Sequence, residues 1–147
     1  GATPPAPLAG PVVAVVAPPP LPPAQASPAA RQALAFARQQ MGQPYLWGGT
    51  GQGGYDCSGL VLAAYANAGI ALPRVAQDQY DGTPKLAAGT PLLPGDLLFF
   101  GTSTSAITHV GMYVGGGLMV NAPYTGTVVQ IDRDNWGGLV GATRPAP

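Results

Sequence analysis

The sequence contains a single cysteine and a single histidine, which together could act as the nucleophile and the base of a catalytic pair. Cys57 directly follows Asp56 and a glycine-rich loop, at the predicted start of a helix. Free backbone N–H groups at a helix N-terminus favour a thiolate, whereas the Asp56 carboxylate opposes it unless its side chain caps the helix. A lone cysteine is more often a small buried apolar residue. Its position nevertheless makes Cys57 a candidate nucleophile, with His109 as the single available imidazole base.

The segment around His109 predicts a strand and a nearby orienting residue. Residues 109–114 alternate with period two, so His109 shares the face that points away from the core with Gly111. We expect this glycine to leave room for a ligand beside the imidazole. A three-residue loop over 115–117 would place Asn121 on the same face, where its amide oxygen accepts the imidazole N–H. A histidine at a strand edge and an asparagine facing solvent would give the same pattern.

The elements that must position these side chains follow in a simple order. A helix is predicted from Ser27 to Gly42, with serine as its cap, and a second from Asp56 to Asn67. A short helix or loop should cover 75–82. Strands are predicted over 96–100, 109–114, 118–122, 128–131 and 139–142. Helices followed by an antiparallel sheet predict an α+β domain.

Composition limits the classes of function. The 147 residues allow one compact domain, and only 8% of them are charged, with a net charge of zero. That balance provides no electrostatic surface for nucleic acid or an anionic membrane. One cysteine and one histidine fall short of a disulfide or a zinc site, and no apolar run is long enough to span a membrane.

The N-terminal residues 1–26 differ from the rest because proline and alanine dominate them. Such a composition favours extended polyproline conformation. We therefore divide the chain into an extended segment, 1–26, and a catalytic domain, 27–147. Part of the segment is expected to lie along the domain surface, either as a docked linker or, alternatively, across the cleft near Cys57 as an inhibitor.

Four sequence blocks together resemble the NlpC/P60 peptidases, over about residues 29–143. The blocks, in the order of that family, are PYLWGG at 44–49, YDCSGLV at 55–61, LPGDLLFF at 93–100 and HVGMYVG at 109–115. The resemblance implies a papain-like fold, with the cysteine on a helix packed against the sheet that carries the histidine. It also implies hydrolysis of peptidoglycan stem peptides, commonly between D-glutamate and a diamino acid, by a secreted enzyme of the cell wall or periplasm.

The same resemblance assigns roles residue by residue. Cys57 matches the nucleophile, His109 the base and Asn121 a third polar position at which many members carry histidine. Tyr45 matches a tyrosine near the oxyanion site, and Asp56 and Ser58 match positions that receive the free amine of a stem peptide. No metal or organic cofactor is implied, and we expect a monomer whose partners are stem peptides. Alternatives are a silent or self-inhibited wall-binding module and another acyl chemistry on the same fold; a serine hydrolase lacks its G-x-S-x-G motif.

Overall fold

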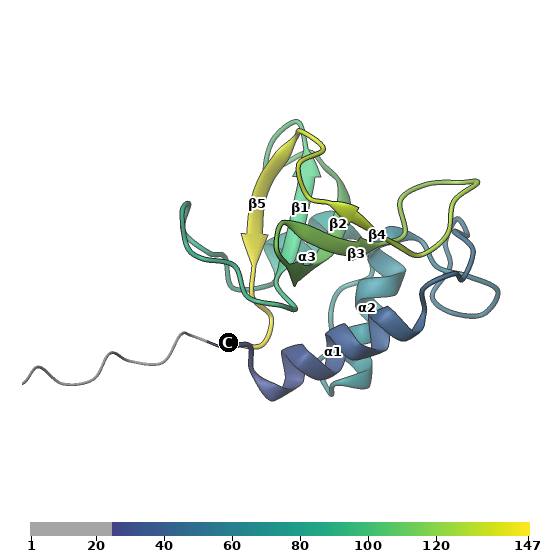
Figure 1. Cartoon of the computed structure of the whole chain (residues 1–147). Coiled ribbons are helices and arrows are strands. Elements are labelled where there is room, and N and C mark those ends of the chain that lie inside the picture. The colour runs from purple at the N-terminus through teal and green to yellow at the C-terminus, as the bar shows by residue number, and fades with distance from the viewer. Residues whose placement is uncertain (1–24) are drawn as a thin grey trace, which may run out of the picture.

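A computed structural model describes residues 25–147 as three helices on one face of a five-stranded antiparallel sheet (Figure 1). The expectations for residues 1–24 lie outside the described residues. At the end of the Pro/Ala-rich segment, Ala26 packs against the core. The two ends of the described chain meet, because the Ser27 hydroxyl donates a hydrogen bond to the carbonyl of Ala146 at 2.8 Å.

The first two helices begin at the caps that the sequence predicts. In α1 (Pro28–Gln39), the Ser27 hydroxyl accepts the backbone N–H of Ala30 at 3.2 Å. In α2 (Cys57–Asn67), the Asp56 carboxylate accepts the backbone N–H of Gly59 at 2.6 Å. The Asp56 side chain thus turns onto the helix backbone, as expected of a cap. The short α3 spans Ala76–Asp81.

The sheet carries its strands in the order β4-β3-β2-β1-β5, with every neighbouring pair antiparallel. The strands are β1 (Leu97–Gly101), β2 (Ile107–Gly115), β3 (Leu118–Asn121), β4 (Gln130–Arg133) and β5 (Leu139–Thr143). The nine-residue β2 lies in the centre and contacts both α2 and α3. The predicted α+β class is confirmed.

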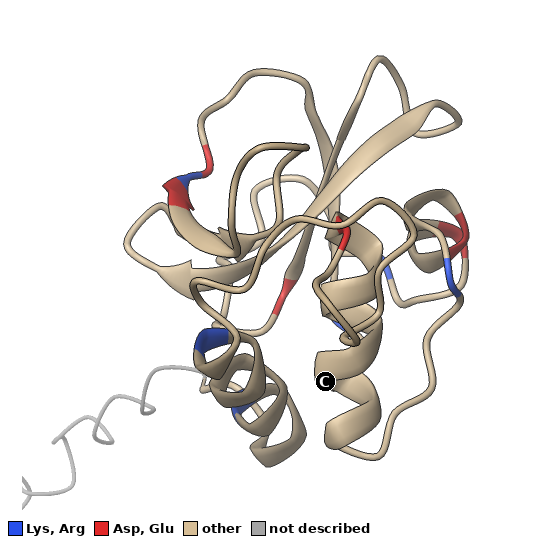
Figure 2. Cartoon of the chain, turned by 90° about the vertical axis from the view of Figure 1, so that its right-hand side faces the viewer, with Lys and Arg blue, Asp and Glu red and all other residues tan. Residues whose placement is uncertain are grey.

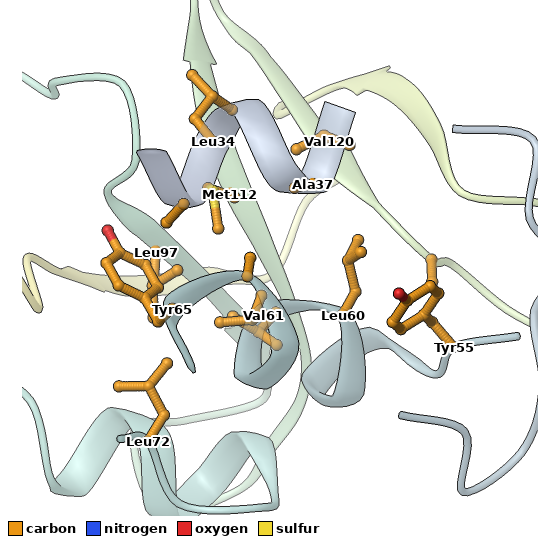
Figure 3. Close-up of a cluster of buried hydrophobic side chains, with 14 of the residues drawn as sticks. Leu34, Ala37, Tyr55, Leu60, Val61, Tyr65, Leu72, Leu97, Met112 and Val120 are labelled. Carbon is orange, nitrogen blue, oxygen red and sulfur yellow. The ribbon is translucent and has the colours of Figure 1, made fainter. Parts of the chain in front are cut away.

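The main core fills the space between the helices and the sheet (Figure 3). Leu34 comes from α1, Leu60 and Tyr65 come from α2, and Met112 and Val120 come from the sheet. A smaller cluster on the opposite face of the sheet contains Leu98, Phe100 and Met119. Because the two faces of β2 enter different clusters, the strand alternation that places His109 away from the main core is confirmed.

Three predicted boundaries are wrong, each for a local reason. The first helix ends at Gln39, and Met41 beyond it is exposed. The hairpin turn is tighter than expected, since Gly115 pairs with Leu118 after a bulge in β2. The fourth strand starts two residues late, because Val129 exchanges backbone hydrogen bonds of 2.8 and 2.9 Å with residues 42–43 rather than with β3.

The first turn of α2 is packed directly on the preceding loop. The carbonyl of Gly49 accepts the backbone N–H of Asp56 at 3.0 Å, and a Cβ at position 59 would overlap with this same carbonyl oxygen. On its other side, the Gln79 amide donates to the carbonyls of Ser58 and Pro73 at 3.1 and 2.9 Å. Gly59 is therefore needed for the close approach of two backbone segments beside Cys57.

Replacing Gly59 by alanine should destabilise the protein by about 3 kcal/mol, because the clash is with backbone that cannot rotate away. The matched control is Gly89→Ala, a position with a φ of 84° and no neighbouring atom within 4 Å. That control should cost about 1 kcal/mol of left-handed backbone strain. Urea denaturation of both variants measures the difference, and equal losses would contradict the packing argument.

Candidate active site

Cys57 is the first helical residue of α2 and lines an open cleft of about 450 Å³. The cleft also contains several of the residues predicted to bind substrate, together with the first two residues of β2. Its lining comprises Tyr45, Trp47, Gly48, Asp56, Cys57, Ser58, Arg74, Val75, Ala76, Gln77, Ile107 and Thr108. Trp47 is 86% exposed at this cleft. The candidate nucleophile therefore faces solvent-accessible space beside a large aromatic side chain.

Two opposing effects act on the Cys57 thiol. Burial raises its pKa, and so does the Asp56 charge. The backbone N–H of Val110, with those of Ser58 and Cys57 itself, lowers the pKa. Burial is the larger effect, so the pKa lies above its ordinary value. The N–H groups at the helix start thus act in the expected direction, toward the thiolate, but burial opposes them. The contact with Val110, the residue that follows His109, also places the thiol against β2.

His109 is 8% exposed and forms a hydrogen bond of 2.9 Å between its Nε2 atom and Oδ1 of Asn121. The predicted pairing of these two side chains is thus present in the structure. Burial lowers the pKa of His109, while the Asn121 hydrogen bond and the Asp132 charge partly offset that effect. The partly buried Cys57 and the buried His109 both favour their neutral forms.

Aromatic rings cover His109 on the side away from the helices. The ring of Trp136 stacks on the imidazole with a centroid distance of 4.8 Å and an angle of 19°. Phe100 contacts both rings at 5.7 Å. The space beside Gly111 is also filled, because a Cβ there would lie 2.6 Å from Sδ of Met119. The expected room for a ligand at Gly111 is therefore absent.

A carboxylate stands behind Asn121. The Asn121 Nδ2 atom donates to Oδ2 of Asp132 at 2.9 Å and to the carbonyl of Gln130 at 3.3 Å. The Gln130 amide donates to both oxygens of Asp132, at 3.1 and 3.0 Å. The side chains of His109, Asn121, Asp132 and Gln130 therefore form one continuous hydrogen-bonded chain.

Arg74 joins the two residues predicted to receive a substrate amine. Its guanidinium contacts both carboxylate oxygens of Asp56, at 3.2 and 2.7 Å, and the hydroxyl of Ser58 at 2.9 Å. This ion pair raises the pKa of Arg74. Tyr45 lines the same cleft as Asp56 and Arg74. Burial raises the pKa of the Tyr45 hydroxyl, and negative charge at Cys57 or Asp56 acts in the same direction.

Four of the six predicted site residues line this cleft, and the other two, His109 and Asn121, are hydrogen-bonded to each other on the sheet. Sequence reasoning missed Asp132, Gln130 and Trp136, and it gave Arg74 no role beyond framing the cleft. Gln130 and Asp132 are two positions apart in a strand, so their side chains point to the same face of the sheet. Once the register of β4 on β3 is known, this is the face of Asn121. Trp136 lies in a loop, and its place over His109 has no sequence signal.

Within residues 25–147, charged groups of both signs are few and scattered, and they form no face of a single sign (Figure 2). No group of three or more His, Cys, Asp or Glu side chains there is arranged to hold a metal ion. The helices in this part of the chain are all too short or too polar to cross a membrane.

Comparison with known proteins gives a consistent result. The model of the NlpC/P60 family matches residues 42–139. A bifunctional muramidase/DL-endopeptidase, CwlT of Bacillus subtilis, is 51% identical over 88 residues, which is 58% of this chain and 26% of CwlT. The chain spans about a quarter of the length of the curated relatives it matches.

Solved structures support the same assignment. An NlpC/P60 family protein of Bacillus cereus aligns with a TM-score of 0.75 and 31% identity, over 82% of this chain and 41% of that protein. The peptidoglycan hydrolase RipB of Mycobacterium tuberculosis aligns with a TM-score of 0.74 and 29% identity, over 92% of this chain and 76% of RipB. The expected papain-like arrangement of helices and sheet is confirmed by these neighbours.

The burial of His109 predicts a specific dependence of stability on pH. Below about pH 6.5 the unfolded chain takes up a proton at this residue, whereas the folded protein, with its lowered pKa, resists protonation. The free energy of unfolding should therefore fall as the pH drops from 7.5 to 5.5. His109→Gln should lose less stability over the same range, measured by urea denaturation at both pH values. Equal losses in the two proteins would contradict the lowered pKa.

Proposed function

This chain belongs to the NlpC/P60 family, and we propose that it is a peptidoglycan hydrolase, a cysteine peptidase that cuts an amide bond of stem peptides. The observation that carries the proposal is Cys57 at a helix N-terminus in an open cleft, against the strand that presents His109 hydrogen-bonded to Asn121. The name of CwlT as a DL-endopeptidase and that of RipB as a peptidoglycan hydrolase support the substrate class.

The first half of the reaction starts from the neutral pair. Because Nε2 of His109 faces Asn121, Nδ1 is the nitrogen left to take the proton of the Cys57 thiol. The sulfur then attacks the amide carbonyl carbon and forms a tetrahedral intermediate. The N–H groups of Cys57 and Ser58, which lie beside the sulfur, and the Tyr45 hydroxyl are the donors that would stabilise the oxyanion. His109 returns its proton to the leaving amine as the C–N bond breaks.

The second half releases the acyl group. His109 takes a proton from water, whose oxygen attacks the thioester carbon, and the C–S bond then breaks as the proton returns to sulfur. One amide and one water give one carboxylic acid and one amine. Burial of His109 suits both steps, because a base with a lowered pKa is unprotonated near neutral pH and releases its proton readily.

The bond we propose is the one between D-glutamate and a diamino acid, with the free amine of the stem peptide bound at Asp56. Oδ1 of this carboxylate accepts from Gly59, Ser58 and Arg74, whereas Oδ2 accepts from Arg74 alone. A carboxylate oxygen has two accepting directions. Oδ2 is therefore able to accept a substrate ammonium without displacing the cap of α2, and Asp56 lines the cleft beside Cys57.

Peptidoglycan lies outside the cytoplasm, so we propose that the enzyme acts in the cell wall or periplasm. We also propose that the enzyme acts as a monomer on its stem-peptide substrates. The reaction we propose uses only groups of this chain and water, and we expect it to need no cofactor.

Mass spectrometry of muropeptides after digestion tests the reaction. Cys57→Ala should abolish cleavage, and His109→Ala should lower it by about a thousandfold because both proton transfers are lost. Asn121→Ala should lower it by about tenfold, since orientation alone is lost. The exposed hydroxyl variant Ser105→Ala is the control and should match the parent. Full cleavage by Cys57→Ala would exclude the nucleophile, and binding without cleavage by the parent would favour a wall-binding module.

Synthetic stem peptides with a free or an acetylated amine test the role of Asp56. The parent should strongly prefer the free amine, and Asp56→Asn should lose that preference, because asparagine caps a helix as well as aspartate but carries no charge. Asp78→Asn, in α3, removes a charge away from the cleft lining and should keep the preference. If Asp56→Asn keeps the preference of the parent, the amine binds elsewhere.

A further inference from the structure

We propose that Asp132 is a positioning residue that holds the Asn121 amide in one orientation and thereby sets the tautomer of His109. The inference rests on the proposed function for its catalytic meaning, while the geometry that supports it is independent of substrate. It extends the catalytic arrangement from Cys57, His109 and Asn121 to a carboxylate on β4 that touches neither substrate nor the reacting sulfur.

The orientation of the Asn121 amide follows from its partners. Nδ2 faces the Asp132 carboxylate at 2.9 Å and the Gln130 carbonyl at 3.3 Å, and both of these groups are hydrogen-bond acceptors only. A rotated amide would place Oδ1 against two acceptors and Nδ2 against the imidazole. The Asn121 side chain is fully buried, so water cannot repair such a mismatch. Oδ1 is therefore directed at His109.

The orientation of the amide decides which imidazole nitrogen carries hydrogen. Oδ1 only accepts, so the 2.9 Å contact requires a hydrogen on Nε2. A neutral imidazole has one such hydrogen, which leaves the lone pair of Nδ1 for the thiol proton. The ring cannot readily turn over to exchange its nitrogens, because it is buried and stacked on Trp136. Without the Asp132 carboxylate, the Asn121 amide loses the hydrogen bond that favours this orientation over the rotated one.

Asp132 is itself held in place for this role. Its two oxygens both accept from the Gln130 amide, and among the described residues no Arg or Lys forms a salt bridge with it. In the register of β3 and β4, Asn121 pairs with Gln130 and Met119 pairs with Asp132. The side chains of Asn121 and Asp132 are therefore diagonal neighbours on one face of the sheet. The negative charge is thus directed at the Asn121 amide and, beyond it, at an imidazolium.

Nuclear magnetic resonance tests the inference directly, because the chain has a single histidine. Long-range ¹H–¹⁵N spectra distinguish the two neutral tautomers and follow their titration. The parent should show the Nε2–H form alone. Asp132→Asn should show a mixture with the Nδ1–H form, a lower pKa of His109 and a loss of kcat/KM on the order of tenfold. Asp134→Asn removes a neighbouring charge without touching Asn121 and should match the parent in all three measurements.

A charge exchange provides a rescue. Asn121→Asp combined with Asp132→Asn moves the carboxylate directly onto Nε2 and leaves an amide behind it that can donate. This double variant should restore the Nε2–H tautomer and raise the pKa of His109 above that of the parent. Asn121→Asp alone places two carboxylates together and should not fold as well, which thermal melting would show.

The outcomes separate this inference from the proposed function. If Asp132→Asn keeps the parental tautomer, pKa and kcat/KM, Asp132 has no positioning role even though the enzyme is active. If Asp132→Asn does not fold, the tautomer in the double variant decides, and an Nδ1–H form there overturns the inference. A parent that shows the Nε2–H tautomer but cleaves no stem peptide contradicts the proposed function. The inference about Asp132 and the His109 tautomer would still stand.

Discussion

The close packing of the first turn of α2 is the constraint on which the rest of this structure depends. The loop carbonyl of Gly49 lies where any side chain at position 59 would be, and the carbonyl of Ser58 is held by the buried amide of Gln79. These two contacts fix the helix end between the glycine-rich loop and α3. A thiol at the first helical position then has one place to lie, against the N–H of Val110.

Burial, rather than the helix dipole, decides the charge state of the site. The N–H groups at the helix start do favour the thiolate, but desolvation of Cys57 outweighs them, and desolvation likewise lowers the pKa of His109. A neutral thiol and a neutral imidazole avoid the free-energy cost of placing charges in a poorly hydrated environment. In the mechanism we propose, the thiolate forms together with the imidazolium, and donors of the protein stabilise the oxyanion that develops on the substrate.

The sheet builds the site from side chains that are far apart in the sequence. β2 presents His109, β3 presents Asn121, and β4 presents Asp132 and Gln130, so that three neighbouring strands together supply the hydrogen-bonded side chains. Charge is used sparingly in this protein, with six aspartates and no glutamate. Asp56 caps the catalytic helix, and the buried Asp96 binds Arg144 and the backbone of Leu93. Most of the carboxylate chemistry therefore serves helix ends, turns and the active site.

Sequence alone determined the elements and singled out the candidate catalytic residues, because caps, strand alternation and four motif blocks are local patterns. Ser27 and Asp56 cap their helices as predicted, and the alternation of β2 correctly separates His109 from the core. Only the tertiary structure decided the electrostatics and the outer partners. Burial opposed the expected shift of Cys57, Met119 filled the space at Gly111, and Trp136 covered His109 from a loop. Desolvation, void filling and loop placement depend on what packs from elsewhere in the chain, and local sequence does not specify these contacts.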